Sequence, residues 1–157
     1  MKILLLQIDK TQDNYIIQGC DIYATRLKNY TALDIQTINV PKTVRMRSQA
    51  EQKKEEARLI FQQILPEDQL ILLDEKGKEF SSAGFADFIS KKQNASLKRL
   101  VFLIGGPFGF DATVYERANI KISLSQMTFS HQMIRLFFLE QLYRAYTILK
   151  GEKYHHE

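Results

Sequence analysis

The chain has 157 residues, of which 45% are hydrophobic and 25% charged, an ordinary composition for one globular domain with a substantial core. The net charge of +4 mildly favours an anionic partner, the single Cys20 excludes an intramolecular disulfide, and no apolar run reaches the roughly 18 residues that span a bilayer. We therefore expect one domain over residues 1–157, in the cytoplasm and with no membrane partner.

Strand and helix patterns alternate in the first part of the chain. The apolar run Lys2–Ile8 is typical of a strand buried on both faces, and Asp13–Leu27 follows as a capped helix. Leu33–Val40 alternates between apolar and polar residues and predicts a second strand. A basic connection, Lys42–Arg47, then leads into a helical pattern over Ser48–Leu65.

The alternation continues in the middle of the chain. Gln69–Leu73 predicts a short strand, and the polar segment Asp74–Phe80 after it predicts a turn with Gly77 at its pivot. Ser81 or Ser82 is expected to cap the next helix, which Asn94–Ser96 ends. Leu100–Ile104 is a further strand composed only of apolar residues.

Two loops rich in small residues separate the last elements. Gly105–Gly109 follows the preceding strand, Asp111–Arg117 predicts a short helix, and Ile120–Ile122 predicts a brief strand. The loop Ser123–Met133 then enters a long helix over Ile134–Leu149, with Ser130 as its expected cap and Gly151 as its expected stop. Strands that alternate with helices in this way indicate an α/β fold with a mostly parallel sheet flanked by helices.

The last helix is apolar on more than one side. One stripe carries Ile134, Phe137, Phe138, Leu142, Ala145, Ile148 and Leu149. A second stripe carries Met133, Leu136, Tyr143 and Thr147 and is interrupted by Glu140. A helix of this kind is buried on more than one side, so we expect the second side to pack against another copy of the chain in a homodimer.

The loops after Leu73, Ile104 and Ile122 all leave the carboxyl ends of predicted strands. In open α/β sheets, ligands bind beyond those ends, so the three loops predict one pocket. Gly105–Gly109 is not a P-loop, because no Lys-Ser or Lys-Thr pair follows it, and Pro107 lacks an amide that a phosphate would need. The glycines either form a plain turn or allow close approach to a ligand without phosphate.

Polar residues in the last third allow both structural and chemical interpretations. His131 is either a local structural partner at the helix start or a base, and Ser123 and Ser125 lack the partners of a serine nucleophile. Glu140 and Arg144 form a favourable i,i+4 pair on the helix, unless Arg144 reaches a phosphate. The histidines do not have the spacing of a zinc site, and we expect no metal.

The ordered set of motifs resembles a known family. The motifs are Leu73-Asp-Glu-Lys-Gly-Lys with Ser81-Ser82, Ile104-Gly-Gly-Pro-Phe-Gly, Ser123-Leu-Ser-Gln-Met-Thr-Phe-Ser-His-Gln-Met-Ile-Arg, Glu140-Gln-Leu-Tyr-Arg-Ala and Gly151-Glu-Lys-Tyr-His-His-Glu. Together they resemble the ribosomal large-subunit RNA pseudouridine N3-methyltransferases of the knotted SPOUT class, over essentially the full chain. One departure is Asp9-Lys10, where a glycine-containing turn is expected.

The resemblance implies a C-terminal trefoil knot, although knots are rare among folds. It also implies an S-adenosylmethionine-dependent enzyme that methylates N3 of a pseudouridine in large-subunit ribosomal RNA. The residues implied to bind this cofactor are Leu73, Gly105, Leu124, Ser125, Gln126, Met127, Thr128 and Phe129. Most of these contacts are expected from the backbone, with apolar contacts from Leu73, Leu124 and Met127.

Methyl transfer to N3 requires an in-line approach and the loss of the N3 proton. We hypothesise that Tyr154 and His155 of one subunit close over the pocket of the other, with Arg144 contacting phosphate or base. His155 is the first choice for the base because of its intrinsic pKa, and His131 is the second.

A net charge of +4 provides few cations for gripping naked RNA, so the expected partner is ribosomal RNA within the assembled ribosome. Two alternatives stay open: a non-catalytic ribosome-binding module that senses S-adenosylmethionine, and a SPOUT methyltransferase that acts on transfer RNA. The absence of an appended RNA-binding domain disfavours the second.

Overall fold

The computed structural model describes residues 1–156, which form an α/β fold around a five-stranded sheet. The strands are β1 (Lys2–Ile8), β2 (Ala32–Ile38), β3 (Gln69–Glu79), β4 (Arg99–Ile104) and β5 (Ile120–Ser123). The helices are α1 (Asn14–Leu27), α2 (Lys42–Arg45), α3 (Gln49–Phe61), α4 (Ser82–Asn94), α5 (Ala112–Arg117) and α6 (Met133–Leu149). Within the described residues, no helix is long and apolar enough to cross a membrane.

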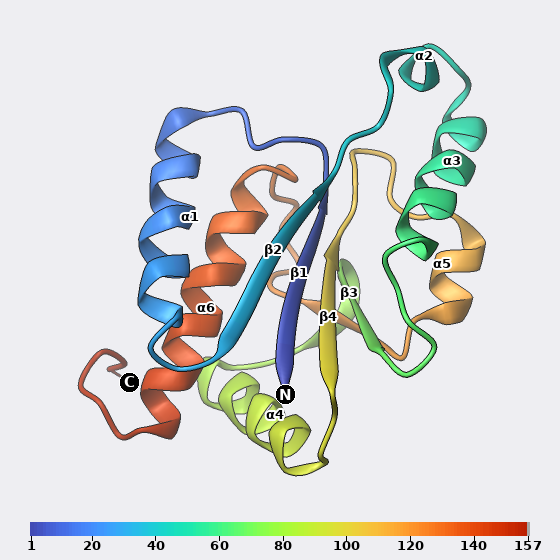
Figure 1. Cartoon of the computed structure of the whole chain (residues 1–157). Helices are drawn as coiled ribbons and strands as arrows, with labels where there is room; N and C mark the ends of the chain where they lie inside the picture. The colour runs from blue at the N-terminus through green and yellow to red at the C-terminus, as the bar shows by residue number, and fades with distance from the viewer. Residues whose placement is uncertain (157) are drawn as a thin grey trace.

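The sheet has the order β2-β1-β4-β3-β5, and every pairing between these strands is parallel. The predicted parallel sheet flanked by helices is therefore confirmed. Helices α1, α4 and α6 cover one face, while α3 and α5 cover the other (Figure 1). Parallel strands joined by crossover helices are buried on both faces, which explains why β1 and β4 are apolar almost throughout.

Two hydrophobic cores result from the alternation of side chains along the strands. Ile3 and Leu5 of β1 join the core under α1, α4 and α6, whereas Leu4 and Leu6 join the core under α3 and α5. Because all strands run in the same direction, the loops after β3, β4 and β5 leave the same edge of the sheet.

The segment after Leu73 differs from the prediction. The sequence predicts a polar turn with Gly77 at its pivot, but β3 continues to Glu79 and pairs a second time with β5 after a shift of register. A Cβ atom at Gly77 would lie 2.6 Å from the backbone nitrogen of Ile122. The glycine therefore permits close approach of two strands. This requirement depends on a distant residue, but in the sequence it has the same appearance as a local turn.

Two other predictions need correction. The basic connection contains a short helix, α2, and two residues of the expected core stripe of α6 are partly exposed: Phe137 at 38% and Leu149 at 40%. Periodicity places a residue on a helix face, but the edges of that face extend beyond the sheet and the neighbouring helices.

The ends of α6 follow the sequence closely. The Ser130 hydroxyl accepts a hydrogen bond from the Met133 backbone N–H at 3.1 Å, as a cap at the start of the helix. Gly151 adopts a φ of +67° at the carboxyl end, where its N–H donates to Ile148 and that of Glu152 donates to Thr147. This Schellman arrangement reverses the chain and directs the tail back along the helix.

An ion pair secures the opposite edge of the sheet. The Asp68 carboxylate, whose side chain is fully buried, accepts hydrogen bonds from Arg99 at 2.5 and 2.9 Å and from the Leu65 backbone at 2.7 Å. Burial raises the pKa of Asp68, but these hydrogen bonds outweigh it and hold the pKa below its ordinary value of 3.8. A depressed pKa stabilises the fold above the ordinary value, and this contribution is lost as the pH falls through the folded-state pKa.

We expect Asp68→Asn to lower the free energy of unfolding by about 2 kcal/mol at pH 7, because hydrogen bonds between charged groups are lost. Urea titrations of both proteins at pH 7 and pH 3 measure this. The difference should shrink at pH 3; an equal difference at both pH values would contradict the linkage to Asp68.

Candidate functional site

The three segments predicted to converge do form one cavity, of about 550 Å³, at the carboxyl edge of the sheet, although the segment after Leu73 is part of β3 and not a loop. Its walls come from the segment after Leu73, from the glycine loop after Ile104, and from the segment that joins β5 to α6. Cavities of several hundred Å³ accommodate small organic ligands, so this is the principal candidate for a cofactor site.

Hydrogen bonds tie the walls of this cofactor cavity together. The Thr128 hydroxyl donates to the Glu75 carboxylate at 2.6 Å, and the Tyr115 hydroxyl donates to Asp74 at 2.9 Å. The Ser125 hydroxyl accepts from the Met127 N–H at 3.0 Å, which fixes a local turn. The extended part of β3 thus supports the loop on the other side of the cavity, a role that the predicted turn would not have performed.

Most of the residues predicted to bind the cofactor line this cavity. They are Leu73, Gly105, Leu124, Ser125, Met127, Thr128 and Phe129. Gln126 is not among the lining residues, whereas His131 and Ile134, at the start of α6, are. Met127 is 73% exposed, so its side chain lies at the mouth of the cavity.

The chemistry of the walls suits an uncharged or cationic ligand. Two carboxylates, Asp74 and Glu75, line the cavity beside one cation, Lys76, and the remaining walls are mainly apolar side chains and backbone. Burial, followed by the hydrogen bond to Asp74, raises the pKa of Tyr115 to about 12, so the phenol stays neutral. S-adenosylmethionine fits such walls, because it carries a sulfonium cation and no phosphate.

The predicted catalytic residues of the C-terminal tail lie together on α6. Nη1 of Arg144 is 3.2 Å from Nδ1 of His155, and the guanidinium stacks over the Tyr154 ring at 4.7 Å. Glu140 accepts hydrogen bonds from Arg144 and, at 3.0 Å, from Tyr154. Burial, with hydrogen bonds to Tyr23 and Glu140, raises the pKa of Tyr154. The tail residues therefore form one ordered cluster.

This tail cluster is remote from the cofactor cavity of its own chain. Arg144 lies three turns beyond Met133, roughly 16 Å along the helix axis at 1.5 Å per residue, whereas His131 lies in the cavity wall. The tail lies near the amino ends of the strands (Figure 1). Within one chain, the structure thus brings His131 to the cofactor cavity and holds Arg144, Tyr154 and His155 apart from it.

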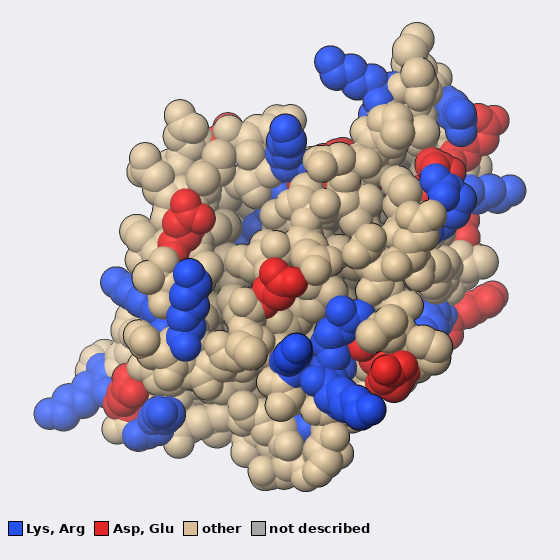
Figure 2. Space-filling model, viewed as in Figure 1, with Lys and Arg blue, Asp and Glu red and all other residues tan. Residues whose placement is uncertain are grey.

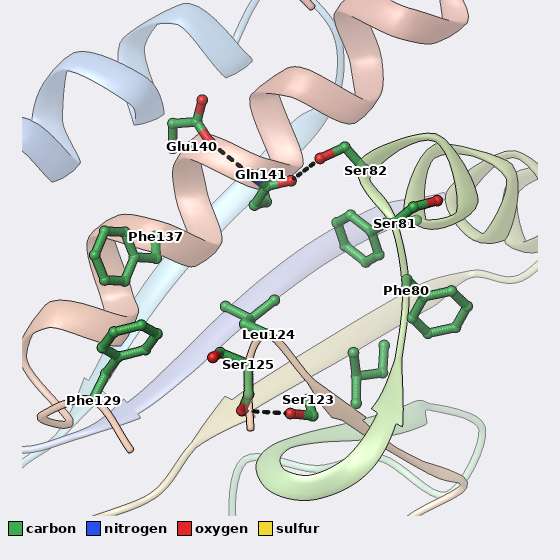
Figure 3. A pocket seen from close by; sticks show the side chains of 12 residues that line it. Phe80, Ser81, Ser82, Ser123, Leu124, Ser125, Phe129, Phe137, Glu140 and Gln141 are labelled. Atoms are coloured by element: carbon green, nitrogen blue, oxygen red, sulfur yellow. Dashed lines mark hydrogen bonds between the residues drawn. The ribbon is translucent and has the colours of Figure 1, made fainter. Parts of the chain in front are cut away.

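A second cavity of about 290 Å³ lies between the cofactor cavity and the tail cluster. It shares Leu124, Ser125 and Phe129 with the cofactor cavity, and Glu140 of the tail cluster lies in its wall. In Figure 3 the rings of Phe129 and Phe137 lie side by side at one end, while Ser82 donates a hydrogen bond to Gln141, next to Glu140, at the other. Phe129 and Phe137 are 39% and 38% exposed.

Sequence reasoning missed two features of the site. Asp74 and Glu75 directly follow the apolar residues of β3, which is a signal for a position at the edge of the sheet, but the polar composition of the segment predicts a turn. Arg135 gave no signal, because a cation inside an apolar helical pattern is normally placed on the solvent side. Its guanidinium is fully buried and donates to the backbone oxygens of Ile8, Asp9 and His131.

Comparisons with known proteins agree along the whole chain. Residues 1–155 match the family described as "Predicted SPOUT methyltransferase". The chain is 56% identical over 156 residues to Ribosomal RNA large subunit methyltransferase H of Cytophaga hutchinsonii. This alignment covers 99% of this chain and 100% of that protein. It is 53% and 51% identical to the proteins of the same name from Flavobacterium psychrophilum and Parabacteroides distasonis, over 100% of both chains in each case.

Proposed function

Because the chain belongs to the SPOUT methyltransferase family, we propose that it transfers a methyl group from S-adenosylmethionine to N3 of a pseudouridine in large-subunit ribosomal RNA. The observation that carries this proposal is the full-length similarity to proteins named Ribosomal RNA large subunit methyltransferase H. The gathering of seven of the eight implied cofactor residues around one cavity supports the choice of cofactor.

The chain's own residues would bind and orient the reactants. Bound S-adenosylmethionine supplies an electrophilic methyl group on a sulfonium. Leu73, Leu124 and Ile134 would exclude water from it, and the carboxylates of Asp74 and Glu75 would favour its positive charge. Gly105 keeps the glycine loop close to the cavity, because a Cβ atom there would lie 2.9 Å from the Phe110 ring.

The N3 proton of the pseudouridine must also leave, and we assign its removal to His155 of the partner subunit. Arginine only donates, so the contact with Arg144 requires Nδ1 of His155 to act as an acceptor. If Arg144 turns toward an RNA phosphate, Nδ1 becomes available for the proton. His131 is the second candidate, since it lies in the wall of the cofactor cavity.

The proposed assembly is a homodimer that acts on the assembled ribosome in the cytoplasm. Exposed apolar side chains on α1 and α6 support a dimer, among them Ile22 at 51% and Phe137 at 38% exposure. A partner bound over the second cavity would bring its tail toward the cofactor cavity. We further propose that the chain acts as a single SPOUT domain with the C-terminal trefoil knot of that class.

Calorimetry with S-adenosylmethionine and mass mapping of ribosomal RNA test this function together. We expect one binding site per chain, and we expect one unmethylated pseudouridine in large-subunit RNA from cells that lack the protein, which the purified protein methylates on ribosomes. Binding without methylation would favour the cofactor-sensing module, and a change confined to transfer RNA would favour the alternative enzyme.

A glycine variant connects this function to the cavity. We expect Gly105→Ala to weaken S-adenosylmethionine binding at least tenfold, because the new Cβ forces either the Phe110 ring or the glycine loop to move. Gly84→Ala is the matched control, since Gly84 lies in the first turn of α4 and its nearest neighbour is the flexible Ser81 hydroxyl. If the two variants bound S-adenosylmethionine with equal affinity, the assignment of the cofactor to this cavity would be contradicted.

A further inference from the structure

A third cavity, of about 280 Å³, lies next to the cofactor cavity at the carboxyl end of β1. Its walls come from the loop after β1, from Arg45 of α2, from Gln52 of α3, from the glycine loop and from the start of α6. The cavity is smaller than the range of about 300–1,000 Å³ for drug-sized ligands, and this volume suits a single nucleobase.

The position of this cavity is its most informative property. Pro107, Phe108 and His131 line both it and the cofactor cavity. The two cavities are therefore neighbours that share part of their lining. A methyltransferase needs its donor and acceptor sites side by side, because the two reacting atoms must come into direct contact in line.

The wall of this cavity is held in place by a network of hydrogen bonds. Asp9 adopts a φ of +62° at the turn where the family resemblance predicts glycine, a conformation that aspartate tolerates. Its carboxylate pairs with Arg45 and accepts from the Val40 N–H at 3.1 Å. The Gln132 side chain accepts from the Gln12 N–H at 2.8 Å and donates to the Lys10 carbonyl at 3.1 Å. The loop that carries Lys10 and Gln12 is therefore fixed against the start of α6.

The polar groups of the residues that line this cavity match the hydrogen-bonding edge of a uracil-type base. That edge presents an N3–H donor between two carbonyl acceptors. The exposed side chains of Lys10 and Gln12 can donate to the carbonyls. Burial, and then the Arg135 guanidinium, lower the pKa of His131. This favours the neutral imidazole, in which one ring nitrogen can accept a hydrogen bond. The Phe108 ring, 42% exposed, offers a surface for stacking.

We propose that this third cavity receives the target nucleotide, with the base stacked on Phe108 and its N3 edge directed toward the side that adjoins the cofactor cavity. The proposal rests on the function proposed above and adds the place where the RNA base binds. The base must leave its stack to enter, as in other enzymes that act on a nucleobase.

Basic side chains at the rim support RNA rather than a free nucleobase as the occupant. Lys42 and Arg47 lie on and beside α2, which contributes Arg45 to the cavity wall, and both are exposed. Lysine and arginine side chains extend from the surface in the region of α2 (Figure 2). They can contact the phosphates that flank an extruded base.

Steady-state kinetics with unmethylated ribosomes test this placement. We expect Lys10→Glu combined with Gln12→Ala to raise KM for the ribosome at least tenfold, while calorimetry shows S-adenosylmethionine affinity within twofold of wild type. Lys98→Glu is the charge-matched control, because Lys98 is exposed just before β4, at the opposite edge of the sheet. We expect this control to leave KM within threefold of wild type.

Photocrosslinking provides a readout of position. Ribosomes with 4-thiouridine at the target nucleotide should crosslink to the Phe108 or Lys10 peptide. Crosslinks confined to other peptides, or equal KM values for the double variant and the control, would overturn the placement while leaving the methyltransferase function intact. If the wild-type protein did not bind S-adenosylmethionine at all, the proposed function itself would be contradicted.

Discussion

Replacing His155 by alanine is expected to lower the turnover number about 100-fold or more, because a positioned base contributes about 10²–10⁴-fold to a proton transfer. Affinity for S-adenosylmethionine should change little, since His155 is assigned to the pseudouridine proton and every residue that lines the cofactor cavity is intact in this variant. Single-turnover methylation of ribosomes at saturating cofactor measures the effect. His156→Ala is the control, because the neighbouring side chain is exposed.

Mixed dimers distinguish action across the dimer from action within one chain. Neither Gly105→Ala nor His155→Ala homodimers should be fully active, because the first lacks an intact cofactor cavity and the second lacks the tail base. In a twofold-symmetric dimer, random mixing in equal amounts yields about one quarter of the wild-type sites in intact form. Recovery to about that level supports a tail that acts on the partner. Absence of any recovery would contradict it, and full activity of His155→Ala would remove this residue from catalysis.

Replacing Arg135 by methionine is expected to destabilise the protein by about 4 kcal/mol, since buried carbonyls lose their donors. The guanidinium is fully buried and donates to Ile8 at 2.5 Å, to Asp9 at 2.8 Å and to His131 at 3.2 Å. Methionine fills much of the same volume but donates no hydrogen bond. For a chain of this size, such a loss corresponds to a decrease of roughly 8–16 °C in Tm.

Two further variants make the Arg135 test specific. Arg135→Lys keeps the charge but has fewer donors, so an intermediate Tm is expected. Arg47→Met removes an exposed cation, with an expected change below about 0.5 kcal/mol. Thermal unfolding followed by calorimetry gives all three values. A Tm for Arg135→Met within 2 °C of wild type would show that the buried hydrogen bonds are dispensable.

Arg135 also connects stability to function. It joins the end of β1, where the third cavity begins, to the backbone of His131, which borders both that cavity and the cofactor cavity. We therefore expect folded Arg135→Lys protein to bind S-adenosylmethionine more weakly than wild type. The magnitude should be smaller than for Gly105→Ala, which alters the cavity wall directly.

The sequence by itself determined the elements whose signals are local. Apolar runs identified β1 and β4, serine and aspartate caps placed the starts of α4 and α5, and Gly151 marked the end of α6. The alternation of strands and helices also determined that three loops meet at one edge, because parallel strands all end on the same side. These features depend on residues within a few positions of each other.

The tertiary structure alone decided the features that depend on distant partners. Gly77 lies in a strand because Ile122 lies beside it. Arg135 is buried because backbone carbonyls at the carboxyl end of β1 accept its hydrogen bonds. The third cavity combines residues from five separate parts of the chain. A sequence pattern reports only the preference of each segment, whereas burial and hydrogen bonding depend on which segments the fold brings together.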